Sequence, residues 1–118
     1  MDKVLLSLKN AFFGLKYCFS TQRNMVIHVV IGSFVLISAL VLAVSLTEIL
    51  FLLTAIFLVL IAETLNTALE KGIDLYVQQR NKLAHIAKDI AAGAVLLTSI
   101  FAVLVGLLIL GPPLWQLF

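Results

Sequence analysis

The chain has 118 residues, of which 63% are hydrophobic and 12% charged, and its formal net charge is +2. A soluble domain of this size could not bury so much apolar surface, so lipid must surround most of it. The small net charge gives no argument for a nucleic-acid partner, and the single cysteine, Cys18, excludes an internal disulfide. The composition therefore predicts an all-α integral membrane protein with one compact domain over residues 1–118.

Residues 1–22 have the apolar periodicity of a helix. Apolar side chains recur at spacings of three and four residues: Leu5, Leu8, Phe12, Leu15 and Phe19. Lysines and Asn10 occupy the other positions, and no compact apolar core precedes a small-residue cleavage site, so a signal peptide is not expected. We expect an amphipathic helix on the cytoplasmic membrane surface, either as a plain anchor or as part of a catalytic site.

Three later segments are long and apolar enough to cross a bilayer, which needs roughly 20 residues. The predicted spans are 25–45, 48–69 and 90–110. The first link, around Ser45-Leu46-Thr47, predicts a tight hairpin, whereas the second, 71–89, is polar and is predicted to be a cytoplasmic loop. Pro112 and Pro113 are expected to end the third helix, and Trp115 suits the membrane interface.

The basic residues predict the orientation of the chain. All eight lie before the first span or between the second and third: Lys3, Lys9, Lys16, Arg23, Lys71, Arg80, Lys82 and Lys88. Since basic residues concentrate in cytoplasmic segments, both regions are expected inside. The chain is therefore predicted to be a multi-pass cell-membrane protein with its amino terminus in the cytoplasm and its carboxyl terminus outside.

A polar stripe at the end of the second span is the strongest sign of function. Glu63, Asn66, Glu70 and Asp74 fall on one helix face at about 100° per residue. Acids in a membrane helix are costly, and they usually persist because they bind, move or react with something. Across the polar segment, the adjacent pair Lys88-Asp89 should reach the same cytoplasmic surface as the stripe.

These residue types suit phosphoryl transfer at a lipid boundary. Carboxylates with an amide oxygen are hard ligands for Mg²⁺, and lysine binds phosphate oxygens. A second carboxylate can act as a general base toward a hydroxyl. The sequence has neither a Gly-x-x-x-x-Gly-Lys phosphate loop nor a protein-kinase signature, so a nucleotide site must be of another kind.

Each residue also has a simpler interpretation. Glu63 and Asn66 could hydrogen-bond between helices, Asp74 could be solvated, Lys88 could be a membrane anchor and Asp89 could cap the third helix. The remaining polar residues have such interpretations too: a solvated helix-end acid for Glu70 and a packed interfacial histidine for His28. For the whole chain, the alternatives are a proton-coupled transporter that uses Glu63 and a purely structural membrane protein.

The sequence from Glu63 to Glu70, followed by Asp74 and then by Ala87-Lys88-Asp89-Ile-Ala-Ala-Gly-Ala-Val, resembles the signature of the prokaryotic diacylglycerol kinase family. Arg23-Asn24-Met25-Val-Ile-His28 resembles the start of the first span in the Gram-positive branch, which includes undecaprenol kinases. The likeness covers nearly the whole chain. It implies a homotrimeric membrane lipid kinase that uses ATP and Mg²⁺, with undecaprenol favoured over diacylglycerol as the substrate.

The resemblance also implies roles for individual residues. Glu63 would be the general base on the lipid hydroxyl, Glu70 would hold the metal, and Asn66 would position the reacting groups and the substrate. The nucleotide would contact Glu70 and Asn66 and further residues along the chain: Lys3, Asn10, Gln79, Asn81, Lys88 and Asp89.

One position departs from the family pattern. Just before Arg23-Asn24 the family usually has a glutamate that supplies a second metal ligand, and this chain has Gln22. An amide oxygen can still bind Mg²⁺, but it brings no charge, so the metal should bind more weakly. We therefore expect retained activity with a raised Mg²⁺ requirement, with Gln22, a water or another carboxylate completing the metal site.

Overall fold

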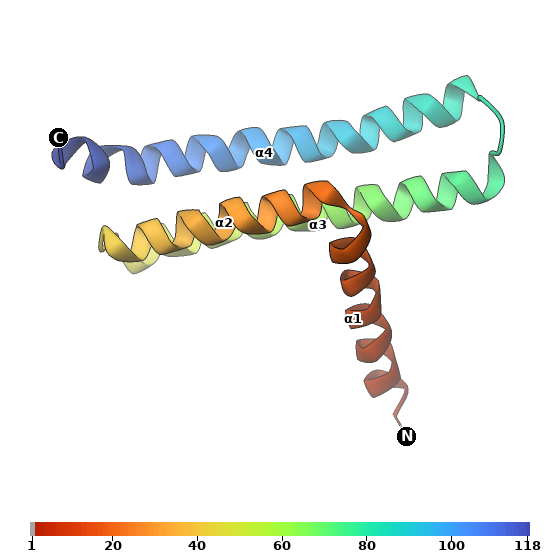
Figure 1. Cartoon of the computed structure of the whole chain (residues 1–118), viewed down its shortest axis with the longest axis horizontal. Coiled ribbons are helices and arrows are strands. Elements are labelled where there is room, and N and C mark those ends of the chain that lie inside the picture. Colours follow the sequence, from red (N-terminus) through yellow and green to blue (C-terminus); the bar gives the residue numbers. More distant parts are fainter. Residues whose placement is uncertain (1) are drawn as a thin grey trace.

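The computed structural model describes residues 2–118, and this part of the chain forms four helices (Figure 1). They are α1 (Lys3–Thr21), α2 (Arg23–Val41), α3 (Leu46–Tyr76) and α4 (Lys82–Gln116). Helices α2, α3 and α4 are each long and apolar enough to cross a membrane. The predicted all-α class and the three candidate spans are therefore confirmed.

The turn between α2 and α3 lies slightly earlier than predicted. Residues 42–45 connect the helices, and Ala43 takes a left-handed conformation with φ of 53°. Ser45 is the N-cap of α3: its hydroxyl accepts the Glu48 N–H at 3.2 Å, and the Glu48 carboxylate accepts the Ser45 N–H. This capping box satisfies donors at the helix start, so Leu46 and Thr47 belong to α3 instead of the hairpin link.

The polar segment 71–89 is mostly helical, so its prediction as a loop was wrong. Helix α3 continues to Tyr76 and α4 begins at Lys82, which leaves only residues 77–81 between them. Asn81 caps α4 by accepting the Ala84 N–H at 3.0 Å, and Asp89 lies inside the helix, not at its N-cap. Polarity ends a membrane span without ending a helix, and the early Asn81 cap starts α4 before the apolar run begins.

The prolines also do not end the last helix where we expected. Pro112 and Pro113 lie inside α4, which continues to Gln116. Proline fixes φ near its helical value and removes an N–H donor. The helix therefore continues through both residues, although the carbonyls four residues before each proline lose their usual partner.

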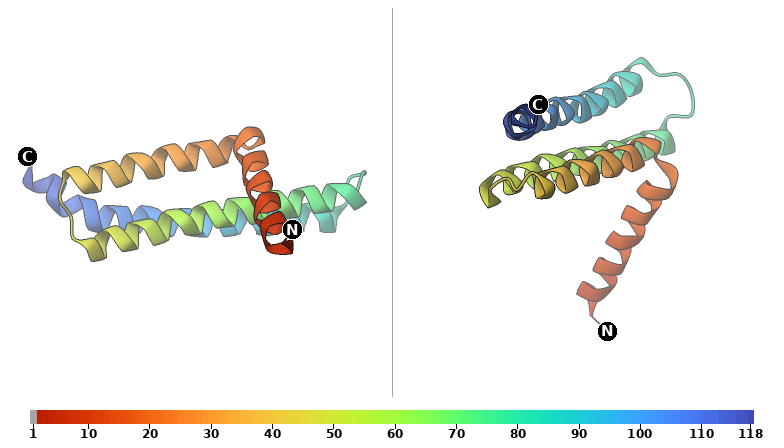
Figure 2. Two further views of the ribbon diagram at one scale, coloured as in Figure 1. Left: turned by 90° about the horizontal axis from the view of Figure 1, so that it is seen from below. Right: turned by 60° about the vertical axis from the view of Figure 1, so that its left-hand side comes forward.

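Helix α3 is the centre of the bundle. It packs along α4 over most of its length and also along α2, whereas α2 and α4 touch each other little (Figure 2). A buried cluster of Ala39, Leu52 and Ile109 joins the three helices near the end opposite α1. At Gly32 the backbone of α2 comes close to the side chain of Ile56 on α3, because a Cβ there would lie 3.0 Å from Ile56 Cγ2.

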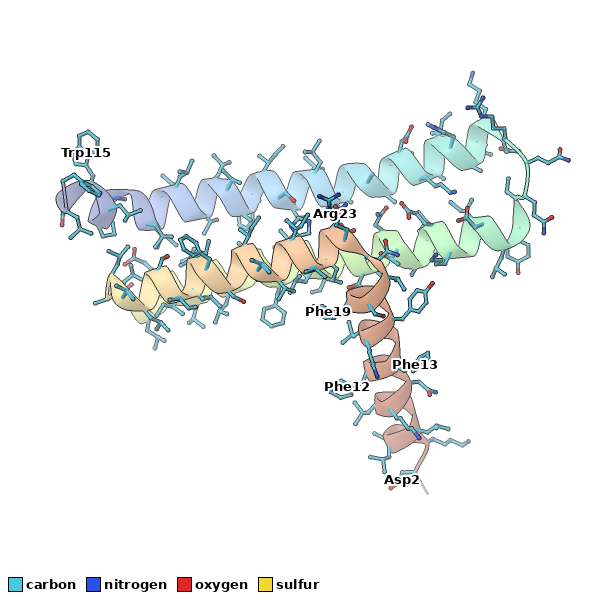
Figure 3. All side chains as sticks on the ribbon, in the orientation of Figure 1. Asp2, Phe12, Phe13, Phe19, Arg23 and Trp115 are labelled. Atoms are coloured by element: carbon cyan, nitrogen blue, oxygen red, sulfur yellow. The ribbon has the colours of Figure 1, made fainter. Side chains whose placement is uncertain are left out.

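Helix α1 runs across the direction of the other three helices and leaves the bundle at Gln22 (Figures 1 and 2). Its carboxyl-terminal half touches α3, where Lys71 Nζ lies 5.8 Å from the centre of the Tyr17 ring. Phe12 and Phe19 project to the side along which the apolar spans run (Figure 3). Both rings are exposed in the single chain, as a lipid-facing surface requires. The position of α1 on the membrane surface stays a prediction.

Candidate functional site

The polar stripe begins at a buried carboxylate. Glu63 is only 3% exposed, in the half of α3 nearer α4's start. One turn later, the hydroxyl of buried Thr67 donates a hydrogen bond of 2.9 Å to the backbone carbonyl of Glu63. This bond does not involve the Glu63 carboxylate, whose partners must come from other helices. A buried acid of this kind is costly unless it is paired or used.

Asn66 and Glu70 form the next part of the stripe, one turn apart on α3. Asn66 Nδ2 donates a long hydrogen bond of 3.4 Å to Glu70 Oε1, and this contact orients the amide. Among the described residues, Asn66 Oδ1 is the buried side-chain oxygen or nitrogen that has no hydrogen-bond partner. An orphaned acceptor beside a half-buried carboxylate suits a donor or a cation that arrives with a ligand.

Helix α4 reaches the stripe at its polar end, as predicted. Lys88 Nζ donates to Asp74 Oδ1, and this ion pair joins the start of α4 to the end of α3. His85 Nδ1 lies 3.0 Å from Asp89 Oδ2, one turn apart on α4, and both side chains are largely exposed. The structure therefore pairs Asp74 with a lysine, whereas the sequence indicated only solvation.

One contact of the stripe was missed by sequence reasoning. His28 Nε2, on α2, lies 3.9 Å from Glu63 Oε2, and the two side chains are 23% and 4% exposed. This is an ion-pair distance if the imidazole is protonated, but it is too long for a hydrogen bond. The sequence did contain a signal for this contact, because His28 is an ionisable residue inside a predicted membrane span. Such residues are usually functional.

The contact between His28 and Glu63 also shows where Gln22 lies along the helix axes, relative to the residues of α3. Helices α2 and α3 are antiparallel (Figure 1), and His28 lies opposite Glu63. Gln22 is about 9 Å from His28 along α2 and Glu70 is about 10 Å from Glu63 along α3, at 1.5 Å per residue. Gln22 and Glu70 therefore lie at a similar depth, although the Gln22 amide here donates to Thr21 Oγ1 at 3.2 Å.

Four predicted nucleotide residues make no hydrogen bond or ion pair with the stripe in the described part of the chain. Lys3 and Asn10 are exposed on the part of α1 that runs away from the bundle (Figure 2). Gln79 and Asn81 belong to the connection 77–81, which helps to form a shallow pocket of about 390 Å³. The Asn81 carbonyl oxygen is already used to cap α4.

An apolar groove lies between α2 and α4, with α3 as its floor. Its volume is about 430 Å³, and it runs from the level of Glu63 to Leu114 near the far end of α4. His28 and Ser99 line one end, and the remaining lining residues of the described chain are apolar or glycine. The groove therefore combines a hydrocarbon-lined channel with a polar end beside the buried acid.

The oxygen donors of the site fit Mg²⁺ better than a tightly coordinated transition metal. Residues 2–118 contain no group of three His, Cys, Asp or Glu side chains that could hold a metal alone. Mg²⁺ is commonly held by one or two carboxylates together with substrate phosphates. Glu70 with the orphaned Asn66 oxygen, and Gln22 at a similar depth, supply such a partial set.

The chain also matches a known protein family. The sequence profile of a family described as prokaryotic diacylglycerol kinase matches residues 9–110. The chain belongs to this family. The family of lipid kinases recognised from the Glu63–Asp89 motif is therefore confirmed.

Two curated proteins are similar to the chain over nearly its whole length. A diacylglycerol kinase of Synechocystis sp. is 47% identical over 115 residues, which cover 97% of this chain and 66% of that protein. The undecaprenol kinase of Bacillus subtilis is 32% identical over 114 residues, 97% of this chain and 93% of that protein. The chain thus spans just under two thirds of the Synechocystis protein, and the two relatives are named for different lipid substrates.

Proposed function

We propose that this protein transfers the γ-phosphoryl group of ATP to the hydroxyl of a membrane lipid alcohol, with undecaprenol favoured over diacylglycerol. The observation that carries the proposal is the position of the buried Glu63 carboxylate. It lies 3.9 Å from His28, which lines one end of the apolar groove, and the Asn66–Glu70 oxygens follow it toward the polar end of α3. The site therefore offers a lipid side and a phosphate side with one acid between them.

Glu63 acts as the general base in this reaction. The hydroxyl oxygen of the lipid forms a bond to the γ-phosphorus of ATP while the bond from that phosphorus to the β,γ-bridging oxygen breaks. The hydroxyl proton goes to the Glu63 carboxylate, and the products are the lipid phosphate and ADP. Burial of Glu63 excludes water, which would otherwise compete with the lipid for the phosphoryl group.

Glu70 and Gln22 would hold Mg²⁺, with the Asn66 side-chain oxygen beside them. When bound, this ion would neutralise charge on the ATP phosphates. The orphaned Asn66 oxygen supports this choice, because no partner for it exists in the described chain, and the half-buried Glu70 carboxylate next to Asn66 brings a negative charge. Gln22 adds an oxygen but no charge, so the proposed site should need more Mg²⁺ than one with a second carboxylate.

Lys88 and Asp89 are the proposed nucleotide contacts on α4. The Lys88–Asp74 ion pair is partly exposed, and such pairs contribute only about 0–1 kcal/mol, so ATP phosphates can take the lysine from Asp74 at little cost. Lys3, Asn10, Gln79 and Asn81 complete the proposed nucleotide contacts. For Asn81 the free group is its amide N–H₂, since its oxygen caps α4.

The apolar groove is long enough to hold an extended hydrocarbon chain. From Ser99 to Leu114 it follows α4 for about 22 Å at 1.5 Å per residue, most of the thickness of a bilayer core. Undecaprenol has one long hydrocarbon chain, whereas diacylglycerol has two. The length of the groove suits a chain of either lipid, so the proposed preference for undecaprenol rests on the likeness of Arg23-Asn24-Met25-Val-Ile-His28 to the Gram-positive branch.

The proposed assembly is a homotrimer with the amino terminus and the active site in the cytoplasm and the carboxyl terminus outside. Only 6% of the most apolar stretch of α4 is buried within the chain, so its outer faces must meet lipid or other subunits. The basic residues come from α1, the start of α2, the end of α3, the connection 77–81 and the start of α4, which all lie in the half of the molecule that holds this connection (Figure 1). That half would face the ATP pool.

A panel assay tests the proposed function. Purified protein in detergent micelles receives ATP and Mg²⁺ with undecaprenol, diacylglycerol or a shorter prenol, and phosphate transfer to each lipid is measured. We expect transfer to undecaprenol at the highest kcat/KM. Absence of transfer to every alcohol would contradict the proposal and favour the transporter alternative, in which Glu63 carries a proton.

A further inference from the structure

His28 joins the two halves of the proposed site. It lines the groove, and its Nε2 atom lies 3.9 Å from Glu63 Oε2. We propose that His28 is a substrate-binding residue whose Nε2–H donates a hydrogen bond to the lipid hydroxyl and holds that hydroxyl against Glu63. This inference rests on the proposed function and adds a residue to it.

The distance between the two side chains suits a shared hydroxyl. An oxygen about 2.8 Å from both His28 Nε2 and Glu63 Oε2 is at normal hydrogen-bond length to each. With 3.9 Å between those two atoms, the angle at the shared oxygen is close to 90°. A hydroxyl can hold both bonds at this angle, because it donates its proton to the carboxylate and accepts the imidazole proton on a lone pair.

The protein holds His28 in position from both sides along α2. Met25 and Gly32 lie one turn before and one turn after it on the same face, and both are buried. At Gly32 the backbone of α2 lies close to Ile56 of α3, which leaves little freedom for α2 to move relative to Glu63. The contact between His28 and Glu63 is therefore built into the packing of α2 on α3.

The polarity of the groove supports the same role. In the described chain, the groove lining is apolar except for His28 and Ser99, which lie at the Glu63 end. A polar side chain in a membrane span is costly, and a leucine would fill the same volume without that cost. At 3.9 Å from Glu63 the imidazole is too far for a direct hydrogen bond, and the hydroxyl of a lipid alcohol is a polar group that could bridge the two side chains.

Three substitutions separate hydrogen bonding from packing. His28→Gln puts an amide nitrogen close to the position of Nε2, His28→Asn reaches only the position of Nδ1, and His28→Leu keeps the volume without a donor. We expect His28→Leu and His28→Asn to lower kcat/KM for undecaprenol about tenfold or more, and His28→Gln to stay within about threefold of wild type. The KM for ATP should be unchanged in all three, and size-exclusion elution shows that each variant assembles.

Two results would overturn this inference alone. One is wild-type kcat/KM in both His28→Leu and His28→Asn, which would make the imidazole a packing residue. The other is an equal loss in all three folded variants, which would show that a donor at Nε2 is not what matters. Wild-type protein is assayed with the same alcohol in parallel, and its failure to transfer phosphate would instead contradict the proposed function, and this inference with it.

Discussion

Glu63→Gln is the substitution that most directly tests the proposed chemistry. Glutamine keeps the shape and an oxygen of the glutamate but cannot accept the hydroxyl proton. General-base catalysis contributes about 10²–10⁴-fold, equivalent to about 2.7–5.4 kcal/mol in the activation barrier. Because Glu63 is only 3% exposed, bulk water cannot replace the missing base, so we expect the upper part of this range.

The assay measures kcat for phosphate transfer to undecaprenol at saturating ATP and Mg²⁺. Glu48→Gln is a matched control, because Glu48 lies on the same helix in the capping box at the opposite end. It should keep its activity and most of its stability, because glutamine can also accept the Ser45 N–H in a capping box. If Glu63→Gln keeps more than a tenth of the wild-type kcat, Glu63 is not the base.

Four further predictions concern the metal, the nucleotide, the groove and the packing. Gln22→Glu should lower the Mg²⁺ concentration for half-maximal activity about tenfold, because it adds a charged ligand at the depth of the proposed metal. An unchanged Mg²⁺ titration would contradict the role of Gln22. Lys88→Met should raise the Kd for ATP about 10–100-fold through loss of a charge-assisted hydrogen bond. Isothermal titration with ATP measures this Kd, and an unchanged value would contradict the role of Lys88. Gly106 lines the groove, so Gly106→Leu should raise the KM for undecaprenol but not for a two-isoprene alcohol that is too short to reach Gly106. Equal effects on the KM of both alcohols would show that the lipid chain does not lie in this groove. Gly32→Ala should lower thermal stability by about 1–3 kcal/mol through overpacking, whereas Gly72→Ala, where a Cβ meets nothing within 4 Å, should not.

The parts of the site that lie on one helix were predictable from sequence. The 3.6-residue repeat sets the faces of Glu63, Asn66 and Glu70 whatever packs against them. The approach of Lys88 to the stripe was also predictable, because a helical hairpin returns to the surface that it left. The pairing of Lys88 with Asp74 adds the partner that this argument lacked.

Features that depend on packing between helices could not be read from the sequence. The contact of His28 with Glu63 depends on how far α2 slides along α3, which is set by the close approach at Gly32. The orphaned Asn66 oxygen depends on which neighbours happen to reach it. The ends of α3 and α4 were misjudged because hydropathy reports where a span leaves the lipid, and capping residues such as Asn81 determine where a helix starts.

The short connection 77–81 limits how the protein can enclose a nucleotide. Five residues extend to at most about 18 Å, and they already join the ends of two packed helices. No slack remains for this segment to fold over ATP as a lid, as long loops do in many soluble kinases. Enclosure must then come from elements that can turn as units, and α1, joined to the bundle through the single non-helical residue Gln22, is the one such element in the described chain. An enzyme built in this way would open and close by tilting a helix on the membrane surface.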